Sequence, residues 1–379
     1  MILTITSFFL FAYVLVSLIL PGPGGLAAKT AAGLFCLACS QKFLIYERLG
    51  GAFFAPDLPR PFLLIMETLY AALVILFFLL LIKDLAGFVL WLSRHMGTSW
   101  HLPFTVAQRN AGMAALALAL GVFGVWQSVK VPAARTVEIV LPNLPPQADG
   151  FSLVQLSDIH IGPLLKGPWL RAVVERANAL RPDAVVLTGD FIDGTPGELA
   201  ADIAPLGDLR AKYGVYGITG NHEYYYNAAA WLPVLESLGV DMLHNEHRTL
   251  GPAGSELVIA GLPDPTEKRF GGPGPDFEAA LQGAPDTARV LLAHQPGGAR
   301  GRQGVDMQLS GHTHGGLIFF LKPLIARFNA GFVHGLYDVD GMKLYVHPGT
   351  GLWNGFSYRL GVPSEITRFI LRAPGAMPS

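Results

Sequence analysis

An almost uncharged stretch from Phe62 to Ile82 constrains the fold of this chain more than any other feature. A helix needs about 20 largely apolar residues to cross a bilayer, and this stretch meets that requirement. Three other stretches approach it, and charged residues make up only 15% of the chain, against ~25% in soluble domains. We therefore predict a transmembrane helical domain over residues 1–129. Its predicted spans, about four, are 2–20, 26–46, 62–82 and 112–129.

Three charged side chains within these spans need an interpretation. Lys29 and Lys42 lie near the ends of 26–46, where long side chains can reach the membrane interface. Glu67 lies about a turn inside 62–82, and an intramembrane carboxylate is a functional candidate by default. We interpret Glu67 as lying close enough to the interface to be solvated.

The basic residues that flank the spans indicate the side on which the rest of the chain lies. With four spans, one side carries Lys42, Arg48, Arg60, Lys130 and Arg135. The other side carries Lys29, Arg94 and Arg109. The excess predicts that the C-terminal domain is cytoplasmic. The loop that holds Trp100 and His101 is typical of interfacial anchoring.

The remainder of the chain predicts an α/β domain. Residues 130–150 are rich in proline and indicate a linker with an edge strand at about 135–141. From 151 to 373, strand-like and helix-like runs alternate, which is typical of sheets covered by helices. The net charge of −1 disfavours a nucleic-acid partner. Later strands are expected at 257–260, 288–293, 306–310, 333–339, 342–346 and 366–371, with a hairpin turn at Asp340-Gly341.

Five consecutive strand ends in this domain carry side chains that can bind metal ions. The blocks are Ser157-Asp-Ile-His160, Gly189-Asp-Phe-Ile-Asp193, Gly220-Asn-His-Glu223, His294-Gln-Pro296 and Gly311-His-Thr-His-Gly-Gly316. In sheets of this kind ligands bind beyond the carboxyl ends of the strands. We expect the outer side chains of Asp-x-His and His-x-His to point the same way from extended backbone, into one metal region.

These five blocks, in this order, closely resemble the calcineurin-like metallophosphoesterase family from about Val154 to His314. The resemblance implies a four-layer α/β/β/α sandwich and a metal-dependent phosphoric ester hydrolase. It also implies that one ion is held by Asp158, His160, Asp190 and His314. Asp190 would bridge to a second ion, held with Asn221, His294 and His312. By the same resemblance, His222 contacts the scissile phosphate and protonates the leaving oxygen.

The residue types fit this chemistry. Mixed carboxylate, amide and imidazole ligands suit two divalent ions such as Mn²⁺, Fe²⁺ or Zn²⁺. Two such ions can lower the pKa of a bridging water and hold both oxygens of an in-line displacement. We expect Asp193 to orient a ligand and not to bind metal itself.

Other motifs are similar to those of a membrane-anchored subfamily, which includes the animal transmembrane protein with metallophosphoesterase domain. The motifs are SDIHIGP, GNHEYY, GHTHGG and GLWNGFSYRLGVPSEIT. After GHTHGG, many relatives have glutamine, whereas this chain has Leu317, followed by apolar residues that include Phe319 and Phe320. Our hypothesis is that these three residues form a substrate rim that meets the bilayer or an acyl chain. The alternative is a helix or strand packed on the core.

The sequence therefore predicts a membrane-tethered phosphodiesterase or pyrophosphatase, acting by attack of a metal-bridging hydroxide on a substrate that can be lipid-borne. The main alternative is a phosphomonoesterase, including a phosphoprotein phosphatase. A non-catalytic metal-binding scaffold is the third reading, and it is disfavoured because every ligand type is present.

Overall fold

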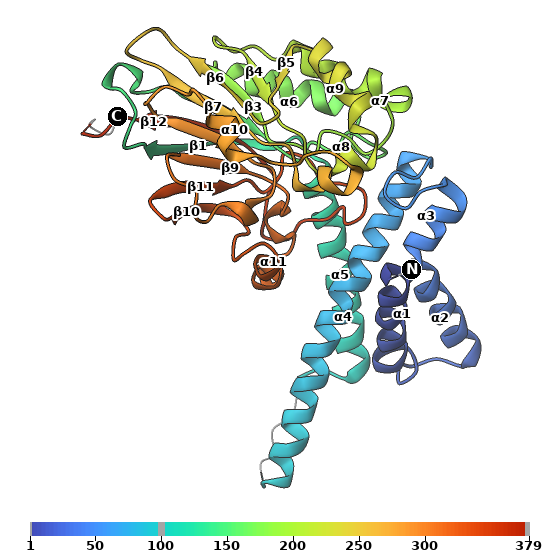
Figure 1. Cartoon of the computed structure of the whole chain (residues 1–379). Coiled ribbons are helices and arrows are strands. Elements are labelled where there is room, and N and C mark those ends of the chain that lie inside the picture. Colours follow the sequence, from blue (N-terminus) through green and yellow to red (C-terminus); the bar gives the residue numbers. More distant parts are fainter. Residues whose placement is uncertain (1, 98–102, 376–379) are drawn as a thin grey trace. The chain divides into compact units, whose positions relative to one another are not determined.

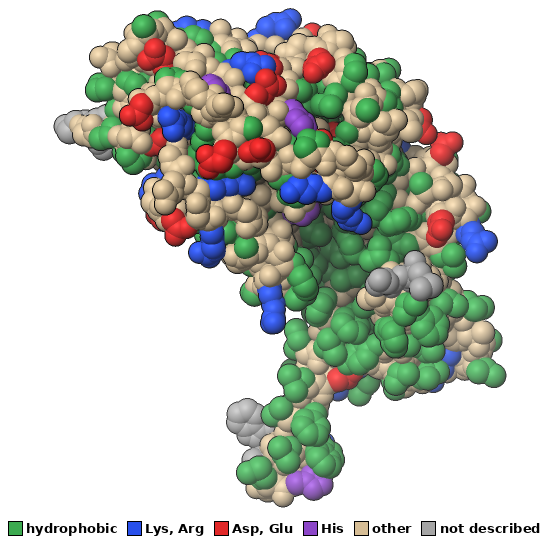
Figure 2. Space-filling model, in the orientation of Figure 1, with side chains coloured by type: hydrophobic (Ala, Val, Ile, Leu, Met, Phe, Trp, Pro, Cys, Tyr) green, Lys and Arg blue, Asp and Glu red, His purple; other side chains and the backbone are tan. Residues whose placement is uncertain are grey.

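The computed structural model describes residues 2–97 and 103–375, and the chain divides into two compact units (Figure 1). The helical unit comprises Met1–Gln127 and Gly355–Leu360, and the catalytic unit comprises Ser128–Asn354 and Gly361–Ser379. The predicted interfacial residues Trp100 and His101 lie outside the described residues. In the space-filling view, the visible surface of the helical unit is mainly hydrophobic, whereas the catalytic unit displays both basic and acidic side chains (Figure 2).

The helical unit is built from apolar helices. Its elements are α1 (Ile2–Val14), the π-helical η1 (Leu15–Ile19), α2 (Leu26–Ser40), α3 (Lys42–Gly50), α4 (Arg60–His95) and α5 (Val106–Val129). The expected span 26–46 is interrupted at Gln41, which separates α2 from α3. The 15 residues of α2 extend only about 22 Å at 1.5 Å per residue, which is less than the hydrocarbon core of a bilayer.

Two helices, α4 and α5, are long and apolar enough to cross a membrane. Only 22% and 28% of their most apolar windows are buried inside the protein, so they do not resemble core helices of a soluble domain. The expected span 62–82 lies inside α4, which continues to His95. The expected span 112–129 lies inside α5, which begins earlier, at Val106. Among residues 2–97 and 103–375, the structure thus contains two long candidate spans where the sequence predicted four.

The interpretation of Glu67 as solvated is wrong. Its side chain and that of Lys42 are both fully buried, and they form an ion pair in which Lys42 Nζ lies 2.9 Å from Glu67 Oε2. Lys42 is consequently paired inside the helical unit and is not exposed. A buried carboxylate in an apolar helix requires such a partner, because an unpaired charge is costly to remove from water.

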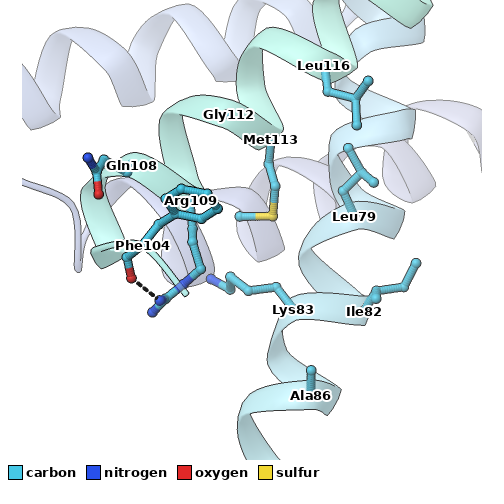
Figure 3. A pocket seen from close by; sticks show the side chains of 10 residues that line it. All are labelled: Leu79, Ile82, Lys83, Ala86, Phe104, Gln108, Arg109, Gly112, Met113 and Leu116. Atoms are coloured by element: carbon cyan, nitrogen blue, oxygen red, sulfur yellow. Dashed lines mark hydrogen bonds between the residues drawn. The ribbon is translucent and has the colours of Figure 1, made fainter. Parts of the chain in front are cut away.

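A groove of about 700 Å³ lies between α4 and α5 (Figure 3). Leu79 and Ile82 line it from α4, and Met113 and Leu116 line it from α5. Arg109 donates a hydrogen bond of 2.6 Å to the carbonyl oxygen of Phe104 at its edge. No predicted site residue lines this groove.

The catalytic unit contains two six-stranded sheets. The first sheet, in spatial order, has β1 (Ala133–Val140), β12 (Glu365–Arg372), β2 (Ser152–Leu156), β3 (Ala184–Leu187), β4 (Val215–Gly217) and β5 (Val240–Met242). The second has β10 (Gly335–Val339), β11 (Met342–Val346), β9 (Met307–Ser310), β8 (Arg289–Leu292), β7 (Leu257–Gly261) and β6 (Glu246–Leu250). Both sheets are mixed: β2 to β5 are parallel with β12 antiparallel to β2, and the second sheet has antiparallel pairs at its two edges.

Helices cover the outer faces of the sheets. The α-helices of this unit are α6 (Gly167–Ala179), α7 (Pro196–Ile203), α8 (Asn221–Tyr225), α9 (Ala228–Ser237), α10 (Phe277–Leu281) and α11 (Lys322–Phe328). The short helical turns are η2 (Pro146–Ala148), η3 (Ala204–Asp208), η4 (Pro265–Phe270), η5 (Pro296–Gly298), η6 (His314–Gly316) and η7 (Phe319–Leu321). In α6 the buried residues Leu170, Val173, Val174 and Ala177 recur at helical spacing, which gives this helix one apolar face.

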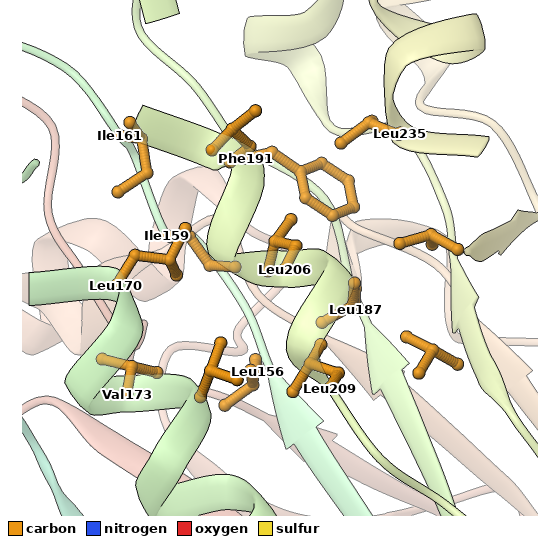
Figure 4. Packing of buried hydrophobic residues seen from close by; sticks show 14 of the residues in the cluster. Leu156, Ile159, Ile161, Leu170, Val173, Leu187, Phe191, Leu206, Leu209 and Leu235 are labelled. Atoms are coloured by element: carbon orange, nitrogen blue, oxygen red, sulfur yellow. The ribbon is translucent and has the colours of Figure 1, made fainter. Parts of the chain in front are cut away.

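Three apolar cores account for the layers of this unit. One core joins α6, α7 and α9 to the outer face of the first sheet, with Leu156, Leu187 and Phe191 among its residues (Figure 4). A second core contains side chains from both sheets and therefore lies between them. A third joins the second sheet to α10. The order helix, sheet, sheet, helix agrees with the sandwich that the resemblance implied.

Candidate metal centre

The predicted ligands follow the carboxyl ends of strands in both sheets. The first sheet supplies Asp158 and His160 after β2, Asp190 after β3 and Asn221 after β4, and the second supplies His294 after β8 and His312 and His314 after β9. The two sets meet, because the backbone N–H of His312 donates to Asp158 Oδ1 at 2.9 Å. In the described part of the chain, three groups can hold a metal ion: Asp158, His160 and His314; Asp190, His294 and His312; and His160, Asp193 and His222.

The backbone at these strand ends is not extended, contrary to our expectation. Positive φ angles occur at Asp158 (51°), His160 (50°), Asp190 (56°), His312 (70°) and His314 (48°). The left-handed conformation costs about 1–2 kcal/mol for a residue with a Cβ atom. The side chains thus reach one region because the chain turns sharply after each strand. Strain of this kind, repeated at five positions, is typical of a functional site.

Asp190 links two of the groups. Its Oδ2 atom lies 3.6 Å from His160 Nε2 and 3.2 Å from His294 Nε2. Its Oδ1 atom accepts a hydrogen bond of 2.9 Å from the backbone N–H of His222. Burial raises the pKa of Asp190, but the charges of His294 and His222 outweigh burial and hold this pKa well below its usual range. One ionised oxygen therefore faces an imidazole nitrogen from each group.

The imidazoles are arranged to offer lone pairs. His294 Nδ1 lies 2.7 Å from the carbonyl oxygen of Thr188, an acceptor that holds a proton on Nδ1, so Nε2 would be the atom that gives up its proton to bind a metal ion. His160 Nδ1 is likewise 3.1 Å from Asp193 Oδ1. The Nε2 atoms of His160 and His294 are buried and form no hydrogen bond within the described residues. Buried polar atoms normally have a partner, so this arrangement fits a cation at these two nitrogens.

The remaining predicted ligands fit the same scheme. His312 Nδ1 lies 2.9 Å from Asn221 Oδ1, which brings the amide and the imidazole together. Burial and the neighbouring His294 lower the pKa of His312 to about 3, so its ring is neutral. His314 Nε2 faces Asp158 Oδ1 at 3.6 Å. All seven predicted ligand residues thus lie around one centre.

Asp193 connects this centre to His222. Its Oδ1 atom accepts from His222 Nδ1 at 2.6 Å and also faces His160 Nδ1. Burial raises the pKa of Asp193, but His160 and His222 outweigh burial and lower this pKa to about 2. Conversely, burial lowers the pKa of His222, but Asp190 and Asp193 raise it to about 9. Asp193 therefore orients both rings, and Asp190 and Asp193 together favour the protonated form of His222.

The comparison with known proteins agrees with this geometry. The family model for calcineurin-like phosphoesterases matches residues 151–316. An uncharacterized metallophosphoesterase of Campylobacter jejuni is 34% identical over 80% of this chain and 79% of its own length. The chain belongs to the calcineurin-like phosphoesterase family. Membership implies phosphoester hydrolase activity with bound divalent metal ions.

Other relatives are also named metallophosphoesterases. The transmembrane protein with metallophosphoesterase domain of Bos taurus is 38% identical over 71% of this chain. The match covers 63% of that protein, so this metallophosphoesterase spans less than two thirds of its length. An uncharacterized metallophosphoesterase of Bacillus subtilis is 34% identical over 61% of this chain and 82% of its own length.

Glu223 is a site residue of this metallophosphoesterase to which the sequence analysis gave no role. Its buried carboxylate accepts from the backbone N–H groups of Gly220 (2.6 Å), Asp190 (2.9 Å) and Phe191 (2.7 Å). Burial and the nearby charge of Asp190 raise the pKa of Glu223 to about 7. This residue ties two ligand-bearing strand ends together. Its position three residues after Gly220, at the start of α8, is the capping spacing that indicates such a role.

The predicted rim residues lie directly after η6, which contains His314. Phe319 and Phe320 are 62% and 43% exposed, and Leu317 is half-buried with a positive φ of 62°. The segment forms η7 and α11 instead of one strand or helix packed on the core. The exposure that the rim hypothesis requires is therefore present at both phenylalanines.

Proposed function

We propose that this protein is a membrane-tethered phosphoesterase that hydrolyses a phosphodiester or pyrophosphate bond. The observation that carries the proposal is Asp190, because its Oδ2 atom faces His160 in one ligand group and His294 in the other. A carboxylate shared in this way is the arrangement that a two-ion phosphoesterase requires. Hydrolysis of a phosphomonoester, including a phosphoprotein, is the second candidate.

The roles of the individual residues follow from the geometry. One ion would be held by Asp158, His160, Asp190 and His314, and the other by Asp190, Asn221, His294 and His312. When bound, two divalent ions such as Mn²⁺, Fe²⁺ or Zn²⁺ supply an activated water and neutralise charge on the phosphate. Asp193 fixes Nδ1 of His222, so the proton on Nε2 is the one available for the leaving oxygen.

The membrane helices and the aromatic rim support a lipid-borne substrate. The apolar helices α4 and α5 are long enough to span a bilayer, and the exposed Phe319 and Phe320 follow the predicted ligand His314 within six residues. Lys322 and Arg327 accompany them on α11, and no acidic residue lies in that helix. This combination of exposed aromatic and basic side chains suits a surface of anionic lipid.

Hydrolysis itself is tested with the full chain purified in detergent with Mn²⁺. Substrates are bis- and mono-p-nitrophenyl phosphate, phospholipids and nucleotide–lipid pyrophosphates. We expect metal-dependent diester or pyrophosphate hydrolysis that His222→Ala abolishes and that His244→Ala, a histidine outside the metal-binding groups, leaves unchanged. Faster monoester than diester hydrolysis would favour the second candidate. Two bound ions with no activity on any ester would show a non-catalytic scaffold.

The rim is tested by replacing Phe319 and Phe320 together with serine. We expect slower turnover of a phospholipid in vesicles and an unchanged rate with the small chromogenic diester. Leu336→Ser is the matched control, because it removes an exposed apolar side chain from β10. Equal losses on both substrates would contradict a role of the rim in lipid binding.

We further propose that the catalytic unit lies on the cytoplasmic side, as the excess of flanking basic residues indicates. The side is tested by measuring hydrolysis of a membrane-impermeant ester by sealed vesicles of either orientation, because only a catalytic unit on the outer face of the vesicle can reach this ester. Hydrolysis without detergent by inverted vesicles supports the proposal, and hydrolysis by right-side-out vesicles contradicts it.

A further inference from the structure

The motif GLWNGFSYRLG contains a segment that leaves one unit of the molecule and joins the other. Gly355–Leu360 belongs to the helical unit, whereas the residues on both sides of it belong to the catalytic unit. The segment is largely buried, and the backbone N–H of Arg359 donates to the carbonyl oxygen of Gly124 in α5 at 3.0 Å. The chain therefore crosses between the units at a second place besides the end of α5.

Lys42 and Glu67 hold this segment. Lys42 Nζ donates to Glu67 Oε1 and Oε2 at 3.0 and 2.9 Å, and also to the carbonyl oxygen of Gly355 at 2.9 Å. Glu67 Oε2 accepts from the backbone N–H of Ser357 at 3.2 Å. Tyr46 completes the cluster by donating to Glu67 Oε1 at 2.9 Å. The buried charges thus satisfy each other and two backbone groups of the segment.

The preceding residues are anchored at the metal centre. The backbone N–H of Thr350 donates to the carbonyl oxygen of Ser157 at 2.7 Å, and that of Gly351 donates to the carbonyl oxygen of Asp158 at 2.9 Å. Two residues further on, the ring of Trp353 lies 6.3 Å from the ring of His222. In the sequence, Trp353 therefore lies between a segment anchored beside a predicted ligand and the segment Gly355–Leu360 of the helical unit.

The chain between the two anchors includes a buried amide side chain, that of Asn354. The side chain of Asn354 is 2% exposed, and neither its oxygen nor its nitrogen has a hydrogen-bond partner among the described residues. A buried amide without partners opposes this conformation. The conformation at Asn354 consequently depends on the anchors on either side.

We propose that Lys42 and Glu67 are positioning residues of the active site, which act by fixing Gly355–Leu360 and, through it, Trp353 beside His222. The helical unit is then a part of the catalytic apparatus as well as a tether. This inference rests on the proposed hydrolase function for its kinetic test. It also explains why an ionised pair lies inside an apolar helical unit, where charged side chains are otherwise costly.

The test replaces the ion pair with apolar side chains in the full chain. Apolar residues of similar volume in place of a buried ion pair are often tolerated, so Lys42→Met/Glu67→Met removes the anchor without leaving a charge unpaired. We expect kcat/KM for the small diester to fall between about 2- and 30-fold, mainly through KM, with unchanged metal content. We also expect faster hydrogen exchange of the amides in 350–360. If this variant does not fold, Glu67→Gln is measured in the same way, and we expect smaller changes in the same direction.

A third variant shows whether the effect passes through Trp353. If it does, Trp353→Ala lowers kcat/KM, and adding the Lys42 and Glu67 substitutions lowers it no further. The control is Asp84→Asn, because Asp84 accepts from Tyr13 in the helical unit at 2.7 Å. Wild-type kinetics and exchange in the folded double variant would overturn the proposal, as would losses that multiply with that of Trp353→Ala. If the wild-type chain hydrolyses no ester, the proposed function fails, and the exchange measurement still decides whether the pair fixes the segment.

Discussion

Asp193 makes the sharpest prediction at the scale of single residues. One of its oxygens orients both His160 and His222, and residues of this kind affect metal affinity or activity by about 10- to 100-fold. We expect Asp193→Asn to lower both the affinity for Mn²⁺, through His160, and kcat, through His222. Metal titration and steady-state kinetics measure the two effects separately. A variant with normal affinity and normal kcat would show that Asp193 is only a packing residue.

Gly220 is required by the close approach of two strand ends. A Cβ atom at this position would lie 2.2 Å from Asp190 Oδ1 and 2.5 Å from the Asp190 backbone nitrogen. We therefore expect Gly220→Ala to displace Asp190 and to lose bound metal and activity, as measured by metal analysis and kinetics. Gly197 in α7 is the matched control, because no atom lies within 4 Å of its Cβ position. Alanine there should stabilise the helix by roughly 0.5–1 kcal/mol.

The sequence identified residues with a local signal better than those with a distant one. Asp158 and His312 stand in short blocks after predicted strands, so their positions could be inferred from the order of the blocks. The pairing of Lys42 with Glu67 could not, because the two residues are 25 positions apart and the backbone group that they hold is at Gly355. Contacts of that range depend on tertiary packing, which leaves no periodic pattern.

At the scale of elements, the start of α7 gives a prediction about stability and pH. Thr195 and Glu198 form a capping box in which Glu198 Oε2 accepts from the Thr195 backbone N–H at 2.9 Å and from its hydroxyl at 2.7 Å. We expect Thr195→Ala to cost about 1 kcal/mol and to lower the Tm of the catalytic unit by roughly 2–4 °C.

The pH dependence of this effect has a definite sign. The hydrogen bonds from the Thr195 backbone and hydroxyl lower the pKa of Glu198. A carboxyl whose pKa is lower in the folded state stabilises the protein above its unfolded pKa, and this contribution disappears as the pH falls through the folded value. The difference in Tm between wild type and Thr195→Ala should therefore be full at pH 7 and shrink in acid. A difference that grows in acid would contradict the role of the ionised Glu198.

Elements with strong patterns were predicted, whereas β5 and β6 were not. The hairpin at Asp340-Gly341 is present, and the positive φ angles of 52° and 87° at these residues suit the tight turn. By contrast, β5 has three residues and β6 has mostly polar ones, so neither showed the alternation of a half-buried strand. The break at Gln41 was also missed, because the hydropathy of 26–46 continues through it.

At the scale of the whole molecule, the two units should respond differently to metal removal. The predicted ligands all belong to the catalytic unit, where Asp158 and Asp190 bring buried carboxylates together. A cation that binds only the folded state stabilises it by about 2.7 kcal/mol at 100 times its Kd, and its removal leaves these carboxylates to repel each other. We expect chelation to lower the Tm of the catalytic unit and added Mn²⁺ to restore it.

The helical unit supplies the internal reference for this measurement, because none of the predicted ligands lies in it. Differential scanning calorimetry of the full chain in detergent should show a metal-dependent transition and a metal-independent one. The Asp190→Asn substitution changes the carboxylate that faces both ligand groups. In this variant the change in Tm on adding or removing metal should be greatly reduced. A shift of equal size in this variant would mean that the stabilising ions bind elsewhere. Equal shifts of both transitions would mean that the units unfold together, as a strong coupling through Gly355–Leu360 would produce.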